Sequence, residues 1–154
     1  MIHGAILIGL MINSWSIMAG SLNIEVVEPL RLGKIILTHQ NGLCAMKPSR
    51  TSGLGCSDAL NAQLGMIRIT GVTHTRVRLS SDTYIGKGFE ATLTFYAKNT
   101  DQKIHTLELN SMSSVSQQSQ VSNVDVDVGI DIKITDYTLV KKIVTIPSVI
   151  SADY

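Results

Sequence analysis

Apolar and polar residues alternate without a break from Val124 to Thr135, in the order Val-Asp-Val-Asp-Val-Gly-Ile-Asp-Ile-Lys-Ile-Thr. Because successive side chains of a β-strand point to opposite faces, this order sends one set into a core and the acidic set into water. A helix would scatter the branched side chains around its circumference, and aspartate and β-branched residues are poor helix formers. The strand is unusually long, so we expect a bend or bulge near Gly129. The predicted inward residues are Val124, Val126, Val128, Ile130, Ile132 and Ile134.

The same alternation, interrupted by turn residues, continues along most of the chain. Asn41-Gly42 is a strong two-residue hairpin signal, and we expect it to fold residues 43–46 back on a strand at 30–37. Residues 111–122 are rich in serine and glutamine and predict a loop or a solvated edge. The second clearest strand has the predicted core set Phe89, Ala91, Leu93, Phe95 and Ala97. Further strands are predicted at 22–26, 66–70, 75–80, 104–109, 140–146 and 149–154.

About eight strands, short turns and no convincing helix predict an all-β fold, a β-sandwich with a closed β-barrel as the alternative. Only residues 57–64 could form a helical turn. A chain of 154 residues, 44% of them hydrophobic, suits one domain with a single core.

Residues 1–21 differ in character from the rest, because an apolar run at 4–12 is followed by small and polar residues. The run is too short to span a bilayer, which takes about 20 residues, but it fits the hydrophobic region of a secretory signal peptide. Cleavage after Ala19 or Ser21 would be chemically reasonable. We therefore predict a signal peptide at 1–21 and a single β-sandwich domain at 22–154. The alternative is a buried first strand or helix of the mature domain.

The two cysteines, Cys44 and Cys56, enclose a loop rich in turn-forming residues at 47–55. In an exported protein an isolated pair is most simply a disulfide, which would stabilise the fold by about 3 kcal/mol in the chain-entropy model. A zinc site would need two further ligands, and His39 is the only nearby candidate. A thiol nucleophile would need a base that the local sequence lacks. We predict the disulfide.

Three aspartates, Asp125, Asp127 and Asp131, share one face of the long predicted strand and could offer oxygen ligands to Ca²⁺. However, a calcium loop folds its ligands around the ion, whereas a strand holds residues two apart at about 7 Å and points them in parallel. A solvated acidic face, which also discourages edge-to-edge aggregation, is the better interpretation.

Composition and motifs give little support for other chemistry. A net charge of +1 and an aromatic content of 5% lack the basic excess and stacking aromatics of a nucleic-acid binder. The chain has no Gly-x-Ser-x-Gly elbow and no phosphate-binding loop. We therefore predict no enzyme activity, no cofactor and no metal. A basic patch for an anionic sugar or a phosphate is a weaker candidate, formed by Arg68, Arg76, Arg78 and Lys87.

Residues 30–35, Leu-Arg-Leu-Gly-Lys-Ile, and a final strand ending in Tyr154 resemble the pilin-like secreted domains of bacteria. The likeness is to a group of small domains of unknown function whose early motif is Leu-x-Phe-Gly-x-Ile, with Leu32 here in place of the phenylalanine. It covers about residues 24–154. The resemblance implies an immunoglobulin-like sandwich that lacks one strand, in a structural or adhesive subunit of a bacterial surface fibre. Such subunits assemble by donor-strand exchange, in which a neighbour's strand fills the open groove.

The resemblance also implies partners and a location: other fibre subunits, a periplasmic chaperone, an outer-membrane usher and a host or surface receptor, with export through the periplasm to a cell-surface fimbrium. It implies that Leu22, Ile24 and Val26 are donor-strand residues and that the strand at 149–154 borders the groove. The alternative function is a monomeric secreted β-sandwich that binds a carbohydrate or a protein through its loops. The loop at 47–55 and the serine- and glutamine-rich segment would then be the contacts.

Overall fold

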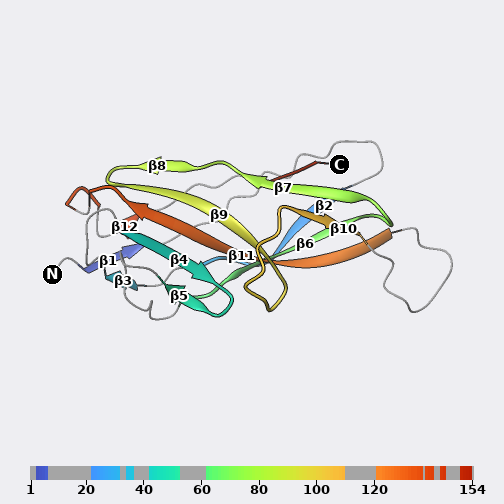
Figure 1. Ribbon diagram of the computed structural model, residues 1–154, viewed down its shortest axis with the longest axis horizontal. Coiled ribbons are helices and arrows are strands. Elements are labelled where there is room, and N and C mark those ends of the chain that lie inside the picture. Colours follow the sequence, from blue (N-terminus) through green and yellow to red (C-terminus); the bar gives the residue numbers. More distant parts are fainter. Residues whose placement is uncertain are drawn as a thin grey trace.

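The computed structural model describes residues 3–6, 22–31, 34–36, 42–52, 62–109, 121–136, 138–140, 143–144 and 150–153. These residues form strands and no helix, so the predicted all-β fold is confirmed for the described part of the chain. The longest strands run along the long axis of an elongated molecule (Figure 1). The strands are β1 His3–Ile6, β2 Asn23–Glu28, β3 Lys34–Ile36, β4 Leu43–Lys47, β5 Arg50–Ser52, β6 Gly65–Val72, β7 Arg76–Ser81, β8 Tyr84–Gly86, β9 Phe89–Ala97, β10 Thr106–Glu108, β11 Val121–Ile134, β12 Ile143–Val144 and β13 Ile150–Asp153.

Strand β11 is the centre of the larger sheet, as Figure 1 shows. One edge of β11 pairs antiparallel with β9 over residues 126–134. The other edge pairs antiparallel with β6 over residues 121–128 and then with β4 over residues 130–133. Strand β2 lies beside β6, β5 beside β4, and β8 beside β9. A long strand with an unbroken apolar face can thus serve as the common neighbour of three others.

The bulge that we expected near Gly129 is absent, because the ladder between β11 and β9 passes through this residue without a shift in register. Gly129 instead marks the point where β11 changes its neighbour from β6 to β4. A Cβ atom at this position would collide with the carbonyl oxygen of Met46 and lie 2.8 Å from Cε2 of Tyr96. The glycine is therefore explained by the close approach of a backbone and a ring.

A smaller sheet, in the order β10-β7-β13, packs over the core face of the larger one. The chain passes from β6 to β7 through a turn in which His74 has a positive φ of 66°. The hydroxyl of Ser81 donates a hydrogen bond of 3.2 Å to the carbonyl oxygen of Leu93, which links the two sheets directly. The smaller sheet contributes Val77, Leu79 and Ile150 to the core.

The predicted core pattern is largely confirmed. Every second residue of β11 from 126 to 134 is at most 1% exposed, while Val124 is partly buried and packs against the core. Along β9, Ala97 is only partly buried, unlike the other four predicted residues. Tyr96 is 1% exposed although it lies outside the core cluster, on the opposite face of β9. The alternation therefore predicted the inner face well and missed a burial on the outer face.

The hairpin predicted at Asn41-Gly42 is wrong in its pairing. Strand β4 pairs with β11 and β5, whereas β3 pairs with β1, and Asn41 itself lies outside the described residues. The hairpin that forms lies later, where the turn at 48–49 joins β4 to β5 within the predicted cysteine loop. Cys44 and Met46 of β4 are buried opposite isoleucines of β11. Burial in the core thus decides the pairing against the local turn signal.

Two other predictions fall partly outside the described residues. Of the helical turn predicted at 57–64, the structure describes only residues 62–64, and Gln63 forms a β-bridge with Arg31. Of the serine- and glutamine-rich segment, it describes only residues 121–122, which belong to β11.

Candidate functional site

A third sheet, in the order β12-β1-β3, lies at the end of the molecule where β11 finishes (Figure 1). Strand β1 pairs antiparallel with β3, with Gly4 opposite Ile35. On its other side β1 pairs parallel with β12, with Ala5 opposite Ile143. Within the described residues, β3 and β12 do not pair with each other. Strand β1 is therefore the piece that joins two otherwise separate strands.

Strand β1 belongs to the segment that the sequence predicts to be a signal peptide. Residues 3–6 form a strand, which is one of the two forms of the alternative interpretation, a first strand or helix of the mature domain. Both predicted cleavage positions lie outside the described residues. Neighbouring strands are about 4.8 Å apart, so β3 and β12 face each other across about 10 Å, the width of one inserted strand. We call the place between β3 and β12, which β1 fills in this structure, the β3–β12 slot.

The predicted donor residues lie on or next to β2, which pairs with β6 of the same chain in an antiparallel ladder. Leu22 and Ile24 pack partly against the core, and Val26 is half-buried. The register shifts between Val26 and Glu28, and Pro29 follows the strand. In this structure β2 is an edge strand of its own domain, and its role as a donor stays a prediction.

The other open edges among the described strands offer little length for pairing with a partner. Strands β5, β8 and β10 each have three residues, and β13 has four. Strand β2 is longer, but a register shift and a following proline are features that protect an edge from further pairing. Strands β3 and β12 are just as short, with three and two residues, so length does not distinguish the slot; what does is that one strand, β1, pairs there on both of its sides.

The acidic face of β11 is not solvated as predicted, and this interpretation was wrong. Asp127 is 8% exposed, and its carboxylate accepts a hydrogen bond of 2.7 Å from the backbone N–H of Asn99. The side chain of Asp125 is 16% exposed and accepts hydrogen bonds from Arg68, at 2.8 Å from Nε, and from Lys98. The bonds from Arg68 are the largest cause that lowers the pKa of Asp125. The acids thus serve as acceptors for neighbouring segments.

No group of three or more potential metal ligands gathers among the residues that the structure describes. Instead, Asp131 is bound by Lys103, whose Nζ lies 3.0 Å from Oδ2. This bond raises the pKa of Lys103. The aspartate face is therefore neutralised by cations and amides of the same chain.

The four basic residues of the candidate patch do not come together. Arg68 lies on β6 in the larger sheet and is bound to Asp125. Arg76 and Arg78 are exposed on β7 in the smaller sheet, and Lys87 lies in the turn between β8 and β9. A shared site for an anionic sugar or a phosphate is not formed by these residues.

Of the predicted disulfide, the structure describes one half. Cys44 is 1% exposed within the core, and no free cysteine is found among the described residues. Cys56 lies outside them, so its pairing with Cys44 stays a prediction. The part of the 47–55 loop that is described forms the β4–β5 hairpin, whose turn is held by Asp101.

Sequence reasoning missed the slot and the group of residues that covers the acidic face. The charged residues Lys98, Asp101 and Lys103 follow β9 directly, and no pattern in the sequence marks them as partners of the aspartates. A signal was present in Tyr96, a large ring at an outward position of β9 where the preceding outward residues are threonine and glutamate. Such a ring predicts that something covers it.

No protein-family model matches the chain, and no curated protein matches it. The described part of the chain also contains no helix long and apolar enough to cross a membrane. The features that bear on function are therefore the geometry of the slot and that of the outer face of the larger sheet.

Proposed function

We propose that this chain is a structural or adhesive subunit of a bacterial surface fibre, which receives a strand of a partner in the β3–β12 slot. The observation that carries the proposal is the position of β1 between two strands that, within the part of the chain that the structure describes, do not pair with each other. In the mature protein the predicted loss of residues 1–21 would remove β1. A partner strand would then restore the same ladders.

The physical reason for strand addition is the cost of unpaired backbone groups. The edges of β3 and β12 that face the slot present N–H and C=O groups, and an added strand gives these groups backbone partners in place of water. An incoming strand satisfies both edges at once, because it pairs on its two sides as β1 does. The proposal thus requires no chemistry beyond backbone pairing and agrees with a role that is not enzymatic.

In this proposal the donor is the segment that contains Leu22, Ile24 and Val26 of a neighbouring subunit. The segment is placed to exchange because β2 is an edge strand, bound on one side by β6 and held by side chains that are only partly buried. A periplasmic chaperone would fill the slot first, and an usher would assemble the fibre. Export also agrees with a disulfide between Cys44 and Cys56.

The proposal is tested with residues 22–154 produced alone in the periplasm. We expect this fragment to aggregate or to be degraded, because the slot is empty. A synthetic peptide of residues 2–8 should rescue a soluble, folded product by refilling the slot, and a peptide of residues 22–28 should do so if β2 is the donor. Size-exclusion chromatography and thermal unfolding measure both effects.

The matched control is the peptide of residues 2–8 with the change Ala5→Pro. Proline lacks the N–H that the ladder needs, so this peptide should not rescue the fragment. If residues 22–154 are instead soluble and monomeric, unfold cooperatively and bind neither peptide, strand exchange is wrong. That outcome would favour a self-contained secreted domain that binds its ligand through loops.

A further inference from the structure

Residues 98–103, which we call the strap, fold back over the outer face of the larger sheet after β9. Backbone hydrogen bonds join the strap to the end of β9: the N–H of Ala97 donates to the carbonyl oxygen of Gln102 at 3.0 Å, and the N–H of Thr100 donates to the carbonyl oxygen of Ala97 at 3.0 Å. Asn99 adopts a positive φ of 59°, a conformation that asparagine tolerates in tight turns. The strap is thus a small folded unit.

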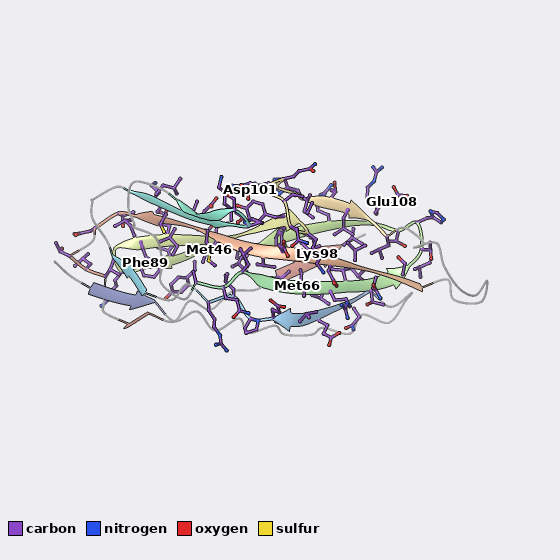
Figure 2. The ribbon with its side chains drawn as sticks, turned by 90° about the horizontal axis from the view of Figure 1, so that it is seen from below. Met46, Met66, Phe89, Lys98, Asp101 and Glu108 are labelled. Carbon is purple, nitrogen blue, oxygen red and sulfur yellow. The ribbon has the colours of Figure 1, made fainter. Side chains whose placement is uncertain are left out.

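Three bonds tie the strap to successive outward aspartates of β11. The ammonium group of Lys98 lies 3.2 Å from Oδ2 of Asp125, and that of Lys103 lies 3.0 Å from Oδ2 of Asp131. Between them, the backbone N–H of Asn99 donates to the carboxylate of Asp127. Figure 2 shows Lys98 near the middle of the sheet. The acidic residues of β11 therefore form a row of acceptors along the length of the strap.

A fourth connection joins the strap to a different hairpin. The carboxylate of Asp101 accepts hydrogen bonds from the backbone N–H of Ser49, at 2.8 Å, and from the hydroxyl of Ser49, at 2.6 Å. The ammonium group of Lys47 lies 3.3 Å from the same carboxylate. Asp101 lies at the outer edge of the molecule in Figure 2. The strap thus bridges the β4–β5 turn and β11.

The bonds that hold the strap to the sheet are polar, and the strap contributes no residue to the described core cluster. Residues 98–103 are themselves exposed. Beneath them Tyr96, which pairs with Lys103 in a β-bridge, is 1% exposed although it points away from the core. Opening the strap would therefore uncover Tyr96 without disturbing the apolar packing on the other face.

We propose that the strap is an acid-released cover, which opens from the sheet as a unit while the sandwich beneath it stays folded. The device does not rest on the proposed strand exchange, because the bonds described above join the strap to β9, β11 and the β4–β5 hairpin. Four carboxylates accept bonds from or within the strap, and protonation of two of them, Asp125 and Asp101, removes the charge that their bonds use. Local opening of this kind is expected where polar contacts alone hold a surface segment.

The direction of the pH effect follows from the groups around the carboxylates. Bonds from Arg68 hold the pKa of Asp125 below its ordinary value of 3.8, and bonds from Ser49 do the same for the pKa of Asp101. A lowered folded-state pKa gives stability that is complete above the ordinary value and is lost as pH falls through the folded value. The strap is therefore closed at neutral and mildly acidic pH, and it opens as the pH falls through the lowered pKa values of Asp125 and Asp101, which lie below the ordinary value.

The charged groups that face these carboxylates come from several elements. Asp125 forms ion pairs with Arg68 of β6 and with Lys98. Glu25 of β2 interacts electrostatically with Arg68. Asp131 meets Lys103, while Tyr96 of β9 and Met66 of β6 lie opposite Asp127 in the ladders. The groups facing Asp101 are Ser49 and Lys47.

Amide hydrogen exchange of the purified protein, measured by NMR between pH 2 and 7, tests the proposal. Rates are divided by those of an unfolded chain at the same pH. Below pH 3.8 we expect the amides of Asn99 and Ser49 to lose protection at least about ten-fold, while residues 130–133 of β11, which pair on both edges, keep theirs. Loss of protection at all these amides together, or no protection of Asn99 and Ser49 at pH 7, would overturn the proposal.

Two variants test whether the strap moves as a unit at pH 7. Asp127→Asn removes the charge beside the Asn99 amide, and we expect the distant Ser49 amide to lose protection about as much as that of Asn99. Asp101→Asn should have the reciprocal effect. The control is Asp136→Asn, because Asp136 also accepts a backbone amide, that of Thr138, but does not touch the strap. If each variant affects only its nearest amide, the strap does not act as one unit. If a variant fails to fold, the pH dependence of hydrogen exchange in the unaltered protein still tests whether the strap opens.

Discussion

The two faces of β11 are held by different forces. On the inner face, residues such as Ile130 and Ile132 are at most 1% exposed and pack among apolar side chains from β4, β6, β7 and β9. On the outer face, Asp125 and Asp127 are bound by cations and amides of neighbouring segments. The inner contacts are non-directional and depend on area, whereas the outer contacts need particular partners.

This difference indicates that the two faces of β11 have different structural roles. Burial on the inner face specifies where β11 lies in the sandwich, because a slip of one residue would send every isoleucine to the other side. The polar contacts on the outer face specify what lies against the sheet, because each aspartate has its own donor. Substitutions on the two faces should therefore differ in size and kind of effect.

The largest effect is expected from Ile130→Ala on the inner face. Ile130 is 1% exposed, and removing its side chain leaves a cavity that costs about 2–5 kcal/mol of the free energy of unfolding. Urea unfolding followed by circular dichroism measures the change. The control is Ile85→Ala on β8, whose side chain is 76% exposed, for which we expect a change within about 0.5 kcal/mol. Equal effects of the two variants would contradict the burial of Ile130.

A smaller effect is expected from Gly129→Ala, which adds a methyl group to the outer face. The new Cβ would collide with the carbonyl oxygen of Met46 and crowd the Tyr96 ring at 2.8 Å. Because a backbone atom cannot rotate away, we expect a loss of about 1–3 kcal/mol in the free energy of unfolding. Asn123→Ala, at an exposed outward position of the same strand, is the matched control. A neutral Gly129→Ala would mean that β4 and β11 separate easily there.

The inner face could be predicted from the sequence because its cause is local. Alternation along β9 and β11 identifies which residues face inward, and no knowledge of the neighbours is needed. The pairing of strands was harder to predict from the sequence, as the Asn41-Gly42 hairpin shows. Its turn signal was strong, but the apolar residues of β4 gain more from burial beside β11 than from pairing with β3.

The candidate site depends on contacts between residues that are far apart in the sequence, and for this reason it could not be predicted. The slot appears only when Ala5 is found opposite Ile143, a parallel pairing without a sequence signature. The cover of the acidic face likewise requires Asn99 to reach Asp127. A row of aspartates on one face of a strand can face solvent, bind a metal or accept hydrogen bonds from the same chain. Only the fold distinguishes these three possibilities.

The smallest effect is expected from Lys133→Gln, on the part of the outer face that the strap does not contact. Lys133 pairs with Glu90 at 4.0 Å, and the two side chains are 61% and 40% exposed. Water screens such a pair, so a double-mutant cycle with Glu90→Gln should give a coupling free energy within about 0.5 kcal/mol. Hydrogen exchange of the Asn99 amide should be unchanged, in contrast to its acceleration in Asp127→Asn. A large coupling here would mean that charge pairing in general stabilises the outer face. A negligible one would indicate that the effect of charge is confined to the aspartates that the strap contacts, whose side chains are less exposed.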